Sequence, residues 1–181
     1  MDKINGWNEV NGKNPGEFEK LPAGGQVCRI MNAVHGESKS GRGMLTLCLD
    51  VATGEYAGFY KKLYDGDDRA DKKWPCKYYQ LTDGDSLSFF KGLITSIEKS
   101  NSGYVWSFDE KLLIGKLIGF VFGEEEYEKQ DGSIGTSVKP FFPRSVEEIE
   151  KGVDIPKPKT LSASGSKSKH SGTPSDSDLP F

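Results

Sequence analysis

Cysteine and histidine are scarce in this sequence and are not arranged for chemistry. Cys28, Cys48 and Cys76 are widely spaced, and the chain of 181 residues contains only two histidines. It has no CxxC pair and no Cys/His spacing typical of a zinc site. We therefore expect buried free thiols in a reducing compartment, no metal and no cofactor.

Long hydrophobic runs are lacking as well. The first residues, Met-Asp-Lys-Ile-Asn-Gly, contain no apolar core of a secretory signal. The most apolar stretch, residues 112–122, contains Lys116 and two glycines and is too short to span a bilayer. These absences predict a cytoplasmic protein without a membrane partner.

A net positive charge, typical of a non-specific nucleic-acid binder, is missing too. The chain has 24 Lys and Arg against 27 Asp and Glu, with a formal net charge of -3. Such a protein can bind nucleic acid only where its cations cluster. The sequence shows no nucleophile–base pattern, no phosphate-binding glycine loop and no carboxylate set for a catalytic metal. We find no catalytic residue and expect that the protein is not an enzyme.

The hydrophobic pattern predicts a mainly β domain with one principal helix. Residues 44–51 alternate between apolar and polar side chains, as a half-buried strand does. Residues 83–100 carry apolar side chains at helical spacing, and a short second helix is expected at residues 145–150. The expected strands are residues 27–34, 44–51, 55–61, 112–122 and 134–142.

This order places the helix between the third and fourth of five strands, which is the connectivity of an OB-fold, a small and partly open β-barrel. Other small α+β sheets share the order. We expect an N-terminal extension over residues 1–20, the OB-fold domain over residues 21–156 and a tail over residues 157–181. The tail is rich in Ser, Gly, Lys, Thr and Asp, a composition that predicts disorder because it cannot form a core.

The tail ends in an unusual group of apolar residues next to acidic ones. The ring of Phe181 can fill an apolar pocket on a partner protein, while its α-carboxylate pairs with an Arg or Lys there. Pro180 limits the conformational freedom that is lost on docking. The candidate partner-docking residues are Asp176, Asp178, Leu179, Pro180 and Phe181.

Residues 56–79 interleave aromatic and basic side chains. Binding a single strand without regard to sequence needs flat faces for unstacked bases, worth about 1–3 kcal/mol per base, and cations for phosphates. Four aspartates in the same stretch weaken the positive charge. We expect Tyr56 and Tyr60 to be exposed and Phe59 to be buried, because the expected strand puts them on opposite faces. Trp74, beside Pro75, is either a loop anchor or a stacking platform. The candidate DNA-binding residues here are Tyr56, Tyr60, Lys61, Lys62, Tyr64, Lys72, Lys73 and Trp74.

An OB-fold binds oligonucleotides on its second and third strands and in the loops that join strands 1–2 and 4–5. Residues 36–43 form the first of these loops, and cations flank the aromatic pair on the last expected strand. An ordinary solvated charge is the competing interpretation for each cation taken singly. The further candidates are Arg29, Lys39, Arg42, Lys139, Phe141 and Arg144.

Two parts of the chain resemble known single-stranded DNA-binding proteins. Asp178-Leu179-Pro180-Phe181 resembles the acidic C-terminal tip of the bacterial proteins, although Ser177 interrupts the acids. The segments at residues 21–25, 54–58, 80–86 and 121–125 resemble single-stranded DNA-binding proteins encoded by phages of Gram-positive bacteria. The resemblance implies an OB-fold protein of the host-cell cytoplasm that coats single-stranded DNA in replication, recombination and repair. It also implies that the tip recruits partner enzymes and competes with DNA for the basic groove.

Other functions fit the same residues. A recombination mediator or strand-annealing protein would carry the same docking tail, and an OB-fold also binds RNA. A metal-dependent nuclease is the least favoured alternative, because no suitable carboxylate set is visible. A homo-oligomer is compatible with every one of these hypotheses.

Overall fold

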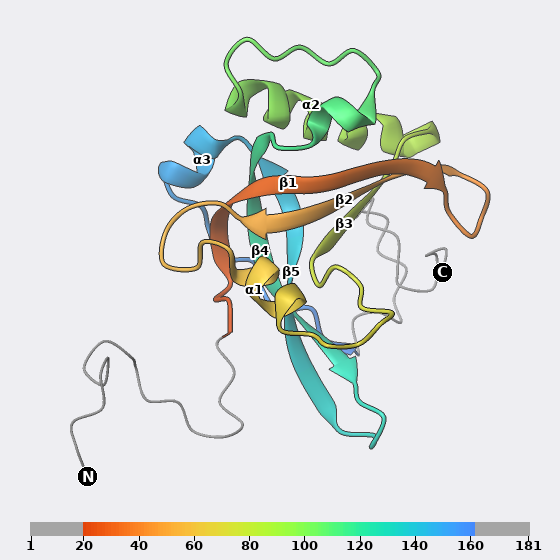
Figure 1. Ribbon diagram of the computed structural model, residues 1–181, viewed down its shortest axis with the longest axis vertical. Coiled ribbons are helices and arrows are strands. Elements are labelled where there is room, and N and C mark those ends of the chain that lie inside the picture. The colour runs from red at the N-terminus through yellow and green to blue at the C-terminus, as the bar shows by residue number, and fades with distance from the viewer. Residues whose placement is uncertain (1–19, 162–181) are drawn as a thin grey trace.

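A computed structural model describes residues 20–161 of the chain (Figure 1). Within these residues lie five strands: β1 (Gly24–Glu37), β2 (Gly43–Val51), β3 (Lys77–Leu81), β4 (Leu117–Glu128) and β5 (Ile134–Arg144). The helices are α1 (Phe59–Asp65), α2 (Leu87–Ser100) and α3 (Val146–Glu150), with 3-10 turns η1 (Gly84–Ser86) and η2 (Glu110–Leu113). None of the helices in this part of the chain is long and apolar enough to cross a membrane.

The five strands form one antiparallel sheet in the order β3-β2-β1-β4-β5. The structure confirms a mainly β domain with α2 between the third and fourth strands. β1, the central strand, pairs with β2 over residues 28–37 and with β4 over residues 24–29. The sheet is strongly curved (Figure 1). Within residues 20–161, β3 and β5 are the two edges and do not pair with each other. The sheet is therefore open along a seam between β3 and β5 rather than closed into a barrel.

The core fills the inside of the curled sheet. The alternation predicted for β2 is found, because Leu45, Leu47 and Leu49 are all buried on the inner face. They belong to one apolar cluster with Leu93 and Ile97 of α2, and α2 lies across one end of the curl (Figure 1). Full burial of one such side chain stabilises the fold by about 1.5–3 kcal/mol.

The strand predicted at residues 55–61 is wrong. Residues 54–58 form a turn in which Gly54 and Gly58 both have positive φ angles, 81° and 74°, and the chain then enters α1. The third strand is β3 (Lys77–Leu81), where no strand is expected from the sequence. The fourth strand begins at Leu117 and not at residue 112, because η2 occupies residues 110–113.

β5 accommodates two prolines because it is an edge strand. Pro140 and Pro143 lack the N–H group that an inner strand would need, and the strand runs on to Arg144. Phe142 pairs with Val121 and Pro140 with Phe122, so Phe141 is the extra residue of a β-bulge. The Phe141 ring lies against the α-carbon of Gly123, where any β-carbon would clash with it.

Asp50 holds α1 against the end of β2. Its carboxylate is buried, and Oδ1 accepts hydrogen bonds from the backbone N–H groups of Val51 at 2.9 Å, Tyr60 at 2.9 Å and Lys61 at 3.3 Å. The N-cap residue of α1, Gly58, has no side chain that could satisfy these donors. One carboxylate from the sheet therefore caps the helix that follows it.

Replacing Asp50 with Ala should destabilise the protein by about 2–3 kcal/mol, because buried N–H groups at the start of α1 lose their acceptor. Urea unfolding followed by circular dichroism measures the loss. Asp50→Asn is the matched control, because it keeps one side-chain oxygen in place and should lose clearly less stability. Equal losses in the two variants would contradict the capping role.

Candidate nucleic-acid interface

The outer side of β1, β2 and β3 carries polar, cationic and aromatic side chains in rows across the strands. Asn32, Cys48 and Lys77 lie opposite one another in the sheet register. The next row is Val34, Thr46 and Tyr79, and Arg29 lies opposite Asp50 further along. We call this surface the three-strand face and define it by the side chains of Arg29, Asn32, Val34, Thr46, Cys48, Lys77 and Tyr79.

An aromatic pair lies next to this face, where the chain leaves α1 and returns to β3. The rings of Tyr64 and Trp74 are 5.1 Å apart between centroids, and Lys72 Nζ lies 4.5 Å from the Tyr64 centroid. The Trp74 Nε1–H group donates a 2.7 Å hydrogen bond to the carbonyl oxygen of Leu49. We call Tyr64, Lys72 and Trp74 the aromatic corner. The hydrogen bond to β2 ties this corner to the sheet.

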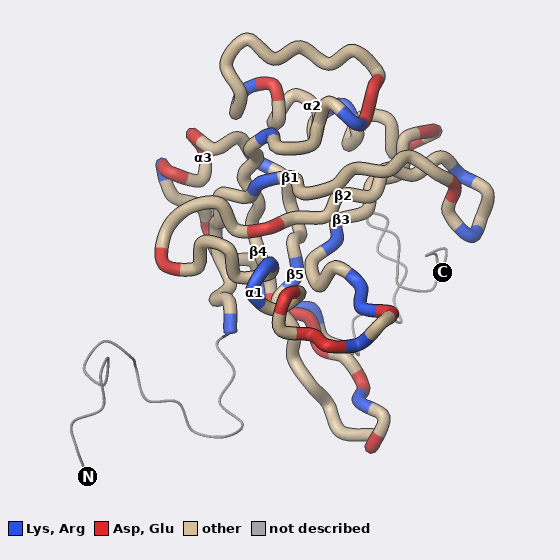
Figure 2. The backbone as a smooth tube through the Cα atoms, in the orientation of Figure 1, with Lys and Arg blue, Asp and Glu red and all other residues tan. Residues whose placement is uncertain are grey.

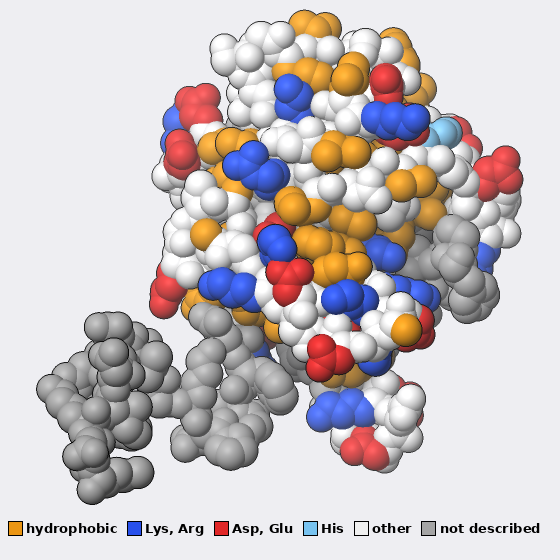
Figure 3. Space-filling view, viewed as in Figure 1, with side chains coloured by type: hydrophobic (Ala, Val, Ile, Leu, Met, Phe, Trp, Pro, Cys, Tyr) orange, Lys and Arg blue, Asp and Glu red, His pale blue; other side chains and the backbone are white. Residues whose placement is uncertain are grey.

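Cations surround the aromatic corner but do not form a purely basic surface. In Figure 3, Lys and Arg side chains border an apolar area over α1 and the start of β3, with Asp and Glu among them. Lys61 Nζ pairs with Asp65 at 2.6 Å. Arg69 donates hydrogen bonds to Asp67 and lowers the pKa of that carboxyl to about 2. Figure 2 shows the same mixture of charges along the chain between α1 and β3.

The β1–β2 loop is fastened to the far end of β3. Arg42 Nη2 lies 2.7 Å from Asp83 Oδ1 and donates to the Asp83 carbonyl oxygen at 2.9 Å. The Asp83 carboxylate also accepts a 3.1 Å hydrogen bond from the Gly43 N–H. Arg42, predicted to bind DNA, is thus engaged in holding the loop, whereas Lys39 is exposed on the same loop.

Two tyrosines predicted to be exposed are not open stacking platforms. Tyr60 is only 6% exposed and stacks on Phe122 with 6.4 Å between centroids. Tyr56 is half-buried, as Tyr64 and Trp74 also are, and packs edge-on against Phe59. The strand alternation on which the prediction depended does not exist here. In α1, Phe59 and Tyr60 both face the core while Lys61 and Lys62 face outward.

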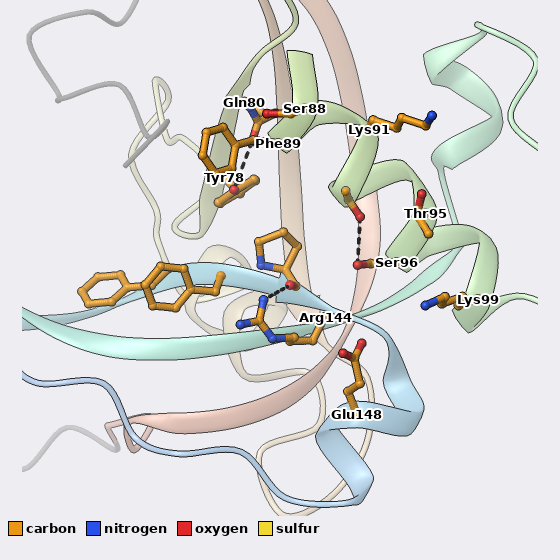
Figure 4. Close-up of a pocket in the computed structure, with 14 residues that line it drawn as sticks. Tyr78, Gln80, Ser88, Phe89, Lys91, Thr95, Ser96, Lys99, Arg144 and Glu148 are labelled. Atoms are coloured by element: carbon orange, nitrogen blue, oxygen red, sulfur yellow. Dashed lines mark hydrogen bonds between the residues drawn. The ribbon is translucent and has the colours of Figure 1, made fainter. Parts of the chain in front are cut away.

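The predicted residues of β5 lie away from the three-strand face. Lys139 pairs with Glu125 at 2.8 Å, and Phe141 is buried with Lys159 Nζ 4.0 Å above its ring. Arg144 lines a pocket of about 760 Å³ between α2 and the two edge strands (Figure 4). We call it the seam pocket, because it lies where β3 and β5 fail to pair.

The structure therefore sorts the predicted residues into separate groups. Those that belong to the three-strand face or the aromatic corner are Arg29, Tyr64, Lys72 and Trp74, whereas Lys61 and Lys62 are exposed on α1 and Lys73 is exposed in the segment that follows it. Those held in the core or elsewhere on the sheet are Tyr56, Tyr60, Lys139, Phe141 and Arg144, while Lys39 and Arg42 lie in the β1–β2 loop. The docking residues Asp176, Asp178, Leu179, Pro180 and Phe181 lie outside the described residues.

The selection of candidates from sequence missed Lys77 and Tyr79. Both belong to β3, and only the pairing of β3 with β2 shows that they share a face with Thr46 and Cys48. Burial alternates along Lys77–Leu81 in the structure, but the sequence Lys-Tyr-Tyr-Gln-Leu does not alternate between polar and apolar side chains and so does not signal the strand. At five residues, β3 is also too short for a hydrophobic pattern to identify it.

The described residues show no metal-binding or thiol chemistry at this face. No group of three His, Cys, Asp or Glu residues within 20–161 is placed to hold a metal ion. Burial raises the pKa of the Cys48 thiol, which the nearby Lys77 ammonium only partly offsets. Burial also raises the pKa values of Cys28 and Cys76 well above the usual range. All three cysteines are free thiols, and at neutral pH they are protonated and poor nucleophiles.

Comparison with protein-family models and with curated proteins identifies no relative. No family model matches the chain, and no curated protein matches it significantly.

Removing the Arg42 guanidinium should raise the pKa of Asp83 toward its usual range, because the hydrogen bond from Arg42 is the main cause of its lowered pKa. A lowered pKa in the folded state stabilises the protein above the unfolded-state pKa, and this contribution disappears as the pH falls through the folded-state pKa. An NMR titration of the carboxyl carbons in Arg42→Ala measures the shift. Asp131, whose pKa is lowered by Ser133, is the internal control and should not change. An unchanged Asp83 pKa would contradict this account of the loop.

Proposed function

We propose that the protein binds single-stranded DNA without sequence specificity, and that the three-strand face and the aromatic corner carry the DNA. The observation that supports this most is the register that puts Lys77 and Tyr79 beside Thr46 and Cys48, next to Tyr64 and Trp74. Flat rings offer stacking surfaces to any base, and adjacent cations contact the phosphates.

The fold supports an OB-fold assignment. Five antiparallel strands in the order β3-β2-β1-β4-β5, with α2 between β3 and β4, fit a partly open barrel whose free edges are β3 and β5. The three-strand face includes the second and third strands, and the fastened β1–β2 loop borders it. These are the places where an OB-fold binds oligonucleotides.

The role in phage replication, recombination and repair comes from the resemblance of the sequence and not from the fold. On the same ground we propose that the tip from Asp176 to Phe181 recruits partner enzymes. A chain that ends after Pro174 should bind oligo-dT at least as tightly as the full chain, because a tip that competes with DNA is gone, and should lose its binding to such enzymes.

Fluorescence anisotropy with a labelled 30-nucleotide oligo-dT tests DNA binding directly. Binding should weaken as salt is raised, because phosphate contacts release counterions. A matched RNA oligomer as competitor separates the DNA-binding hypothesis from the RNA-binding alternative. No binding at low salt would overturn the proposal, and faster annealing of complementary strands would favour the mediator alternative.

Replacing Lys72 and Lys77 together with Ala should reduce the slope of log Kd against log salt by about 0.7 for each phosphate that the two lysines neutralise in the wild type. The slope is measured by anisotropy at several salt concentrations. The matched control is Lys151→Ala with Lys157→Ala, which removes the same charge from the chain at and after α3. Equal slope changes in the two double variants would show that total charge, and not the face, controls binding.

A further inference from the structure

The seam pocket has an aromatic end and a charged end. Figure 4 shows Tyr78 and Phe89 together at one end, and Lys99, Arg144 and Glu148 at the other. Phe89 of α2 and Phe142 of β5 also line it, although their side chains remain 51% and 42% exposed. Apolar rings that stay this exposed around a cavity mark a place where another apolar group can bind.

The charge lining this pocket is positive on balance. Lys91, Lys99 and Arg144 lie along it, against the single carboxylate of Glu148. That carboxylate is already engaged, because it accepts hydrogen bonds from the N–H and the hydroxyl of Ser145 at the start of α3. The pocket therefore suits an aromatic group that has acidic neighbours.

The loop that follows α2 presents such a group. Phe108 is 86% exposed, and its φ of 63° lies in the left-handed region that residues other than glycine seldom adopt. Its ring packs 5.9 Å from that of Trp106, which in turn meets Phe90 of α2 edge-on. The next two residues are acidic: Asp109, whose Oδ1 also accepts a 3.0 Å hydrogen bond from the Lys111 N–H as the N-cap of η2, and Glu110. A residue held in this sparsely populated backbone region is a candidate for a functional contact.

The pocket and the loop that carries Phe108 contact different residues of α2. The helix faces the pocket with Ser88, Gly92 and Lys99. It contacts the loop through Phe90 and through Glu98, whose Oε1 accepts a 2.9 Å hydrogen bond from the Trp106 N–H. Phe108 is not among the residues that line the pocket, and its side chain is 86% exposed. In this structure, Phe108 therefore does not occupy the seam pocket of its own molecule.

We propose that Phe108 of one molecule inserts into the seam pocket of a second copy, with Asp109 and Glu110 meeting the basic side chains there. The contact is heterologous, because each molecule contributes a different surface, so it can repeat from copy to copy as an open chain. It does not depend on DNA, and its test is therefore separate from that of the proposed function.

Two variants each remove one half of the contact without disturbing the fold. Phe108→Gly removes the ring and suits the positive φ. Gly92→Phe fills the pocket, and an added β-carbon at Gly92 meets nothing within 4 Å. Ile155→Ala, at a side chain that is 66% exposed, and Gly36→Phe, where a β-carbon also meets nothing within 4 Å, are the matched controls.

Sedimentation velocity of the full chain without DNA tests the proposal. The average mass of the wild type and of both controls should rise above 19.9 kDa with concentration, whereas each of the two variants alone should stay monomeric. A mixture of the two variants should form dimers and nothing larger, because only the pocket of Phe108→Gly and the ring of Gly92→Phe remain.

Three results would overturn the proposal. One is a wild type that remains monomeric up to its solubility limit. Another is self-association that persists in either variant alone, which would indicate a different interface. The third is loss of self-association in a chain that ends after Leu161, which would show that the tail and not Phe108 occupies the pocket.

Discussion

The contact between Asp50 and the start of α1 determines where the candidate interface lies. This carboxylate, at the end of β2, accepts hydrogen bonds from the backbone N–H groups of Tyr60 and Lys61. It thereby directs the chain from the sheet into α1. From α1 the chain returns to the sheet through Trp74, whose indole N–H donates a hydrogen bond to the carbonyl oxygen of Leu49. Two polar contacts to neighbouring residues of one strand thus hold the whole aromatic corner beside the three-strand face. The corner is positioned by the core and not by an independent loop.

The open seam is the second constraint on the molecule. Two unpaired strand edges are a liability for any sheet, and here the bulge at Phe141 and the prolines of β5 make one edge a poor template for pairing. α2 spans the end of the gap and leaves the seam pocket under it. The three-strand face and the seam pocket thus lie on different parts of one sheet. The proposed DNA site and the proposed self-association site therefore share no residue.

The hydrophobic pattern of the sequence correctly predicted β2 and α2, the elements in which one face of a single strand or helix is buried. The alternation of Leu45, Leu47 and Leu49 and the helical spacing of Leu93 and Ile97 both report burial along a single element, and both were predicted correctly. β3 was missed because its place depends on pairing with β2 across a long irregular segment. The false strand arose because Tyr56, Gly58 and Tyr60 happen to alternate, whereas the Asp50 contact that ends the alternation is not visible in the sequence. Tyr64, Lys72 and Trp74 were chosen for their chemistry and do come together, but Phe141 and Arg144 do not, because β5 lies at the other end of the strand order from β3.

Photo-cross-linking maps the DNA path most directly. A short oligo-dT that carries 4-thiothymidine is irradiated on the full chain, and the attached peptides are identified by mass spectrometry. The account predicts cross-links within residues 64–79, at the aromatic corner and β3. Cross-links confined to α2 and β5 around the seam pocket, or none at saturating oligonucleotide, would contradict it.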